Sequence, residues 1–311
     1  MADANSSTPE VIVFLTHIAP YTLIVISIIS LLGNGTILLV VAKNASLRQK
    51  DCLYLIAALA VADFLTAAGT IPYALNIALN DNINCTVGSI FWSVAGNVSG
   101  VRMNQICTLF LAIDRIYALF QPFAYYAKNH LKVAQFVIFI SFLWSASEMA
   151  SNIFGADLSE AKISCTITVA FPNGFRIYRI FSSVVLNIGT QLLYVVVFWK
   201  LHSLKADSKL SQDSKDRLQQ ANTTVSILFL TSLIFMVLPS IWSVYSFFVQ
   251  TVKLGPIFGI FACLNGAINV FIYGWKHKDF KAAIKTTFGR KTNQIRAEQE
   301  HSQGVAAVQQ R

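Results

Sequence analysis

Ionisable side chains are rare inside the long apolar stretches of this 311-residue chain. Asp63, Arg102 and Glu148 lie well within such stretches, and an acid–base pair, Asp114–Arg115, lies at the end of another. Such groups are costly in a hydrocarbon solvent and are usually functional there. The chemistry they suit is charge pairing, cation binding or recognition of a polar ligand. No HExxH or GxSxG motif occurs and no histidine lies in the middle of an apolar stretch, so we expect no enzyme.

Seven apolar blocks must position these groups. The chain is 55% hydrophobic and only 13% charged, about half the charged fraction of a soluble domain. Each block has about 20 residues or more, enough to cross a hydrocarbon layer of about 30 Å as a helix. We therefore predict an all-α membrane protein, a seven-transmembrane helix bundle. The blocks are Ile18–Ala42, Leu53–Leu79, Val87–Phe120, Val133–Phe154, Ile177–Trp199, Val225–Val249 and Leu254–Trp275.

The net charge of +9 is distributed unevenly along the chain. Of the 24 Lys and Arg residues, 18 lie in the connections on one side of the predicted bundle or after the last block. The connections on the other side contain only Lys162, Arg176, Arg179 and Lys253. The positive-inside rule then places the N-terminus outside and the C-terminus in the cytoplasm of a multi-pass plasma-membrane protein. This placement favours the lipid bilayer as a partner and argues against nucleic acid.

The chain divides into a bundle and two polar ends. Phe280, Ile284 and Phe288 recur every four residues with lysines between them, which is typical of a short amphipathic helix on the inner leaflet. An ordinary solvated tail is the alternative. A glycosylation sequon begins at Asn5. The predicted segments are an extracellular N-terminus (1–17), the bundle with its surface helix (18–288) and a disordered cytoplasmic tail (289–311).

Two of the five cysteines lie on the predicted outer, oxidising side. Cys85 comes just before the third block, and Cys165 lies between the fourth and fifth blocks. A bridge would tie the third helix to the following outer loop, and in the loop-entropy model it would contribute about 4 kcal/mol. Two free thiols are the alternative.

Polar groups from four blocks lie at similar depths. At 1.5 Å per residue, Asn34, Asp63, Asn104 and Asn265 lie about 12–16 Å from the inner ends of their helices, and Asn269 about 9 Å. A lone protonated acid is one interpretation of Asp63. Several amides around one carboxylate better suit a hydrated cluster that holds a small cation such as Na⁺. We expect no other cofactor.

Short motifs occur in a fixed order from Asn34 to about Phe288. They are Asn34 in LLGNGTILLV, LAALAVAD ending at Asp63, Asp114–Arg115–Ile116 with Pro122, Trp144, Pro239, and NVFIY (Asn269–Tyr273) before a basic helix. With them the chain resembles the rhodopsin-like (class A) G-protein-coupled receptors, and within that class it looks like a nematode serpentine chemoreceptor of the Srsx type. The resemblance implies an extracellular ligand and a heterotrimeric G protein as partner; the Na⁺ inferred from the polar cluster would be an allosteric ion.

The resemblance also implies a switch at the cytoplasmic end of the bundle. In that family an acid–arginine pair, here Asp114 and Arg115, acts with residues of the seventh helix, here Asn269 and Tyr273. At rest Asp114 would hold Arg115, which would meet the G protein once the sixth helix swings out. The alternative is that the pair only marks the membrane boundary. Ile116, Val237 and Val270 depart from the family's tyrosine, aromatic residue and proline, so the trigger is expected to differ.

The outer halves of the blocks supply candidates for a ligand pocket. The third block has no acid there, so a simple amine is not expected. An aromatic-lined cleft with a few polar groups suits a small organic molecule; a peptide is the alternative, and Arg176 and Arg179 suit a carboxylate. Each aromatic side chain is also explained by packing or by the interfacial belt. The candidates are Trp92, Asn97, Arg102, Glu148, Arg179, Trp242, Tyr245 and Phe258.

Arg102 and Glu148 lie about 20 and 22 Å from the inner ends of consecutive blocks. Consecutive helices with a short connection are antiparallel neighbours, so we predict a salt bridge beneath the ligand pocket. In the alternative, Arg102 points into the cleft and binds an anionic ligand. A transporter or channel is the alternative class of function, but the chain shows no internal repeat and no paired broken helices.

Overall fold

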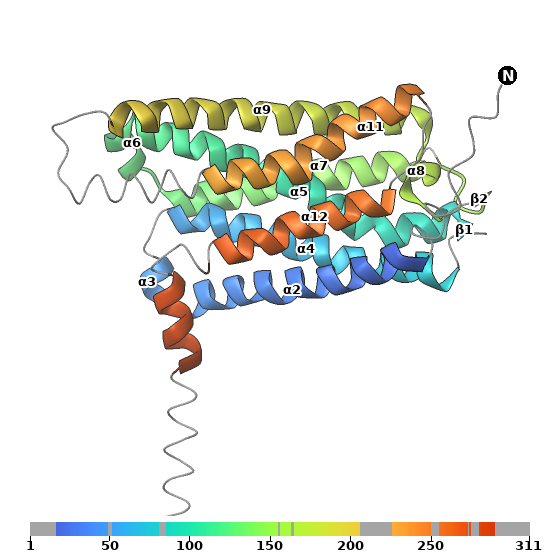
Figure 1. Cartoon of the computed structure of the whole chain (residues 1–311), viewed down its shortest axis with the longest axis horizontal. Helices are drawn as coiled ribbons and strands as arrows, with labels where there is room; N and C mark the ends of the chain where they lie inside the picture. Colours follow the sequence, from blue (N-terminus) through green and yellow to red (C-terminus); the bar gives the residue numbers. More distant parts are fainter. Residues whose placement is uncertain are drawn as a thin grey trace, which may run out of the picture.

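Seven long helices lie side by side in the part of the chain that the computed structural model describes (Figure 1). The described residues are 17–48, 52–80, 85–154, 156–162, 165–205, 226–249, 255–272, 274 and 280–289. The helices are α2 (Ala19–Lys43), α4 (Cys52–Leu79), α5 (Val87–Phe120), α7 (His130–Phe154), α9 (Asn173–Lys205), a helix over Ser226–Val249 that contains η2 (Leu233–Val237) and α11 (Leu238–Val249), and α12 (Gly255–Phe271). The predicted all-α bundle is confirmed.

The outer surface of the bundle is apolar. Within the described residues, five helices are both long and apolar enough to cross a membrane, and α12 is a shorter apolar helix. Large apolar side chains such as Leu32, Val185 and Leu192 remain more than half exposed around the bundle. In contrast, the charged helix α5 packs against α4, α7 and α9, and its Arg102 is buried. Charge is therefore kept inside the protein, as a lipid solvent requires.

Short elements gather at the two ends of the bundle (Figure 1). One end carries β1 (Cys85–Thr86), β2 (Ala161–Lys162) and α8 (Ile167–Ala170). We name it the disulfide end, because Cys85 and Cys165 are bonded there. The other end carries α3 (Ala45–Arg48), α6 (Pro122–Tyr126) and a helix over 280–289 that lies beside α3, roughly perpendicular to the long helices. We name it the Asp-Arg end, after Asp114–Arg115.

The predicted amphipathic helix is present at residues 280–289, after the last long helix. Phe280 is fully buried and packs in one cluster with Leu47 and Leu53, so it docks on the bundle itself. Lys281 and Lys285 are exposed on the opposite side. The helix thus covers the Asp-Arg end of α2 and α4 with its apolar face.

Helix α9 begins earlier than its apolar block predicts. It starts at Asn173, and the Arg176 N–H already donates to the Pro172 carbonyl (2.9 Å). Arg176 and Arg179 therefore both lie within α9, so counting them with the connection was wrong; Arg179 already falls inside the predicted block Ile177–Trp199. Hydropathy marks where apolar residues begin, whereas a helix continues through polar residues as long as its backbone hydrogen bonds are satisfied.

Glycines set the close approach of α4 and α5. A Cβ atom on Gly69 would lie 2.1 Å from the backbone carbonyl carbon of Gly96, and one on Gly100 would lie 2.3 Å from the backbone nitrogen of Thr66. Small residues allow helix backbones in membranes to approach this closely. These contacts hold the helix that carries Asp63 against the central helix α5.

Replacing Gly69 with alanine is expected to lower the thermal midpoint of the purified protein. The added methyl group meets backbone, which has no rotamer to yield, and overpacking typically costs about 1–3 kcal/mol. Gly189→Ala is the matched control, because a Cβ atom there would have no neighbour within 4 Å. Equal midpoints for the two variants would show that the α4–α5 contact is not tight.

Candidate functional site

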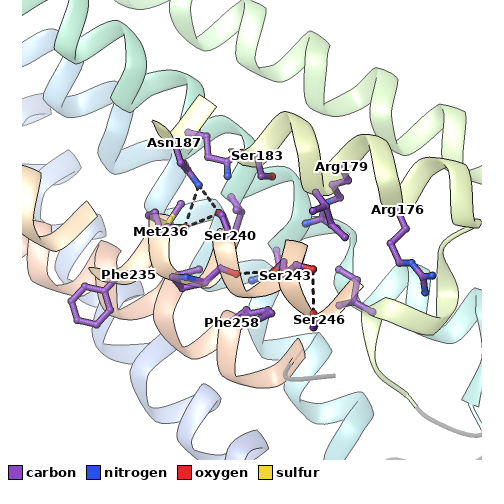
Figure 2. A pocket seen from close by; sticks show the side chains of 18 of the residues that line it. Arg176, Arg179, Ser183, Asn187, Phe235, Met236, Ser240, Ser243, Ser246 and Phe258 are labelled. Carbon is purple, nitrogen blue, oxygen red and sulfur yellow. Dashed lines mark hydrogen bonds between the residues drawn. The ribbon is translucent and has the colours of Figure 1, made fainter. Parts of the chain in front are cut away.

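A cavity of about 210 Å³ lies toward the disulfide end, between α5, α9, α11 and α12. Tyr73 of α4 and Phe171, which follows α8, complete its wall. Figure 2 shows Arg179 and Asn187 along α9, on the side that faces the serines of α11. The lining is mainly apolar with a few polar groups, as is usual for a small-molecule site.

A covalent strap holds the segment beside this cavity in place. Cys85 and Cys165 form the predicted disulfide. Strands β1 and β2 pair antiparallel, with Cys85 opposite Lys162. The Gly88 N–H donates to the Leu158 carbonyl (2.9 Å). The strap fixes the segment that leads to Phe171, so one wall of the cavity is tied to the start of α5.

We expect Cys85→Ser and Cys165→Ser to reduce surface expression equally, and the double variant to be no worse. The bond closes a separation of 80 residues, which is worth about 4 kcal/mol in the loop-entropy model. Peptide mapping without reduction should recover the linked pair. Alkylation of both thiols in correctly surfaced protein would contradict the bond.

Three of the predicted pocket residues line the cavity, namely Asn97, Arg179 and Phe258. The roles of Trp92, Trp242 and Tyr245 in ligand binding stay predictions that this cavity does not support. None of these three side chains lines the cavity, and they are 65%, 39% and 49% exposed on the outside of the bundle. A membrane helix is apolar on its lipid face as well as its protein face, so an aromatic residue's position in the sequence does not reveal which way it points.

Sequence reasoning missed the polar wall on α11. Ser240, Ser243 and Ser246 line the cavity, and each hydroxyl donates to a carbonyl of its own helix at 2.7–3.1 Å. The Asn187 amide donates to Ser240 Oγ (2.8 Å). The spacing of three residues was the available signal, because residues at i and i+3 share a helix face.

A π-helical turn lies just before Pro239. In η2 the Leu238 N–H bonds to the Leu233 carbonyl, one residue further back than in an α-helix. Phe235 and Met236 from this turn line the cavity. The sequence indicated only the motif proline, Pro239, at this place. π-bulges are frequent at functional sites, where they redirect side chains.

Arg102 and Glu148 form the predicted salt bridge. Both are buried, and Arg102 Nε lies 2.9 Å from Glu148 Oε1. Arg102 also donates to Gln105 Oε1 (2.8 Å) and Ser182 Oγ (2.7 Å). Gln105 lines the cavity, whereas Arg102 and Glu148 do not. The pair lies behind the pocket wall, and Arg102 binds side chains of the protein itself.

Glu148 accepts further hydrogen bonds that the sequence did not suggest. Trp144 Nε1 and the Tyr178 hydroxyl donate to its Oε1 at 2.9 and 3.0 Å. A buried ion pair is stable only when its remaining polar atoms are satisfied in this way. Trp144, which was part of the family motif, thus has a local role as a donor to the buried acid.

The predicted polar cluster is assembled around Asp63 only in part. Asn104 and Asn269 each donate to one of its carboxylate oxygens, at 2.5 and 3.0 Å. Asn34 instead donates to Ser30 and to the Gly266 carbonyl, and its own Oδ1 is buried without a hydrogen-bond partner. Asn265 lines a small cavity of about 10 Å³ that Asn269 also lines.

The Asp-Arg end holds more partners than the sequence indicated. Arg115 Nη2 lies 3.9 Å from Asp114 Oδ2, which also accepts from the Tyr125 hydroxyl (3.3 Å). His130 Nδ1 lies 3.8 Å from Asp114 Oδ1. Phe123 is 91% exposed beside them. The acid is therefore bound by groups from α6 and α7 as well as by its neighbour. Two predicted residues, Tyr273 and the sequon residue Asn5, lie outside the described residues.

One helix links these features, because α5 lines the cavity with Asn97, binds Asp63 through Asn104 and ends just beyond Arg115. A seven-helix membrane protein organised in this way is a receptor of the G-protein-coupled class. Residues 27–288 match the model of the serpentine type 7TM GPCR chemoreceptor family Srsx, and the chain belongs to that family.

Individual proteins that are similar to this chain are also G-protein-coupled receptors. Melatonin receptor type 1C of Gallus gallus is 23% identical over 85% of this chain and 79% of its own length. Melatonin receptor type 1A of Mus musculus is 24% identical over 88% and 80%, and adenosine receptor A2b of Gallus gallus is 23% identical over 83% and 84%. The predicted resemblance and receptor function are confirmed. The chain is a G-protein-coupled receptor with an extracellular ligand.

Proposed function

We propose that the chain is a chemosensory receptor of the plasma membrane. Its cavity near the disulfide end binds a small molecule, and its Asp-Arg end then activates a heterotrimeric G protein. The observation that carries this proposal is that α5 connects the cavity, lined by Asn97, with Arg115 at the opposite end of the bundle. A ligand shifts such a receptor between two states by binding one of them better.

The topology follows from the same arrangement. The disulfide end faces outside, because a disulfide persists in an oxidising environment. The basic connections and the helix over 280–289 face the cytoplasm. In this orientation the exposed lysines of that helix, Lys281 and Lys285, lie at the inner leaflet.

A small molecule fits the cavity better than a peptide does. The volume of about 210 Å³ is below the range of about 300–1,000 Å³ that is typical of drug-sized ligands. The relatives are named as receptors for melatonin and adenosine, which are both small.

Cells that express the chain with a panel of G proteins provide the test. A library of small metabolites is applied in one arm and a library of short peptides in the other. We expect G-protein dissociation with small molecules only. A response to peptides alone would show that the cavity binds a peptide terminus. A membrane current without a G protein would show that the chain works as a channel.

We also propose that Na⁺ binds at the buried carboxylate in the middle of the bundle. Asp63 supplies the charge, and Asn34 Oδ1 supplies a buried acceptor without a hydrogen-bond partner. Oxygen donors of this kind suit a hard cation.

If this is correct, Na⁺ should raise the thermal midpoint relative to choline at equal ionic strength. A tenfold excess over Kd stabilises by about 1.4 kcal/mol. Asp63→Asn should remove the difference between the two salts, because it removes the charge. An equal response to Na⁺ and choline in the unaltered chain would exclude the ion site.

A further inference from the structure

We infer that the ligand of the cavity is a small organic carboxylate whose anionic group pairs with Arg179. The inference rests on the proposed ligand site and names the class of ligand that this site takes. It is carried by the charges of the cavity, by the surroundings of Arg179 and by the shape of the space beside it.

The cavity has a positive electrostatic character. Its lining includes Arg176 and Arg179, and none of its lining residues, all of which are described, is an Asp or Glu. The acid behind the wall, Glu148, is already bound by Arg102 and by two further donors. Its charge is therefore already paired with Arg102, and it does not line the cavity.

The surroundings of Arg179 favour the binding of an anion. Its guanidinium lies over the Phe171 ring, 5.4 Å from the ring centroid, and within the described residues no carboxylate pairs with it. Arg102, by contrast, has a carboxylate and two neutral acceptors. A partly buried guanidinium without an anion is costly, and stacking on an aromatic ring offsets only part of that cost.

A carboxylate is the anion that fits this group. The planar guanidinium presents parallel N–H donors, and a carboxylate accepts two of them at once. Because Phe171 is fixed next to the disulfide strap, the guanidinium stacked on it is oriented before the ligand arrives. Such preorganisation increases affinity by reducing the ordering cost of binding.

The body of the ligand is apolar and compact. Phe235, Met236 and Phe258 line the space beyond Arg179. Asn187 lies eight residues further along α9, about 12 Å away along the helix axis. The Ser243 hydroxyl proton is donated to its own helix, so its oxygen is an acceptor for a donor at the far end of the ligand; Ser240 Oγ already accepts from the Asn187 amide.

The test uses the full chain in nanodiscs of neutral phosphatidylcholine, with thermal midpoint as the readout. Benzoate, hexanoate, octanoate and 4-hydroxyphenylacetate are titrated, each beside its own primary amide. We expect at least one carboxylate to raise the midpoint while its amide does not. Arg179→Gln should weaken that binding at least about tenfold, the value of one lost charge-assisted contact. Arg48→Gln, an exposed arginine at the other end, should leave binding unchanged.

Arg179→Lys keeps the positive charge but loses the planar pair of N–H donors. The affinity of this variant for the carboxylate should therefore lie between those of the unaltered chain and Arg179→Gln. If Arg179→Gln fails to fold, the Arg179→Lys variant alone tests whether Arg179 binds the carboxylate. Three results would each overturn the inference. The amides bind as tightly as the acids, none of the four carboxylates raises the thermal midpoint, or the Arg179 variants bind with unchanged affinity. No G protein is present, so a failure here is separate from a failure of signalling.

Discussion

Replacing Arg115 with alanine is expected to abolish G-protein activation while the receptor still reaches the cell surface. The side chain is 28% exposed at the Asp-Arg end, where it is accessible to a partner. Folding should survive, because Asp114 keeps the Tyr125 hydroxyl and His130 as partners. We expect the rate of nucleotide exchange to fall at least about tenfold, the size of one lost charge-assisted contact.

Two further variants separate a switch from a membrane-boundary marker. Arg115→Lys keeps the charge but not the planar fork, so it should retain partial activity. Arg48→Ala removes an exposed arginine from the same end and should have no effect. Normal exchange by Arg115→Ala at normal surface density would disprove the switch role of the pair.

The second large effect is expected at the buried pair. Arg102→Glu or Glu148→Arg alone should abolish surface expression, because each places two like charges in a space where both side chains are 2–3% exposed. Removing one partner of a buried pair typically costs about 3–5 kcal/mol. Surface labelling and the thermal midpoint measure the loss.

The double charge reversal should restore expression, but only in part. Reversal recovers the attraction between positions 102 and 148. It does not recover the neutral contacts, because Trp144 and Tyr178 are donors suited to an acid at position 148. If both single variants express normally and only the ligand response falls, the salt bridge does not contribute to folding.

The helices and two of the residue pairings could be predicted from the sequence because each depends on a one-dimensional quantity. Apolar length predicted the spans, since a bilayer has a fixed thickness. Depth along consecutive helices predicted the pairing of Arg102 with Glu148. The side of the membrane predicted the pairing of Cys85 with Cys165.

The direction in which side chains point could not be predicted in the same way. Trp92 and Trp242 lie on the outside of the bundle, because lipid accepts aromatic residues as readily as the protein interior does. Asn265 and Asn269, one turn apart, line the same small cavity, yet it is Asn269 that donates to Asp63. The π-turn at Leu233 changes the phase of the helix before Pro239 by one residue, which no hydropathy pattern records.

Departures from the family motif could be located in the sequence but not explained by it. Val270 replaces the expected proline on α12. A Cβ atom on Gly33 would lie 2.8 Å from Val270 Cγ2, so the valine packs into the space that a glycine of α2 leaves. Motif comparison identifies the substitution, and only the packing shows which residue accommodates it.

Nucleotide exchange on a purified heterotrimeric G protein, with the receptor in lipid nanodiscs, tests the account most directly. We predict that the unaltered chain accelerates exchange, that a carboxylate of the panel above accelerates it further, and that Arg115→Ala does neither. Absence of exchange with every class of G protein, together with tracer flux through liposomes that contain the chain, would contradict it.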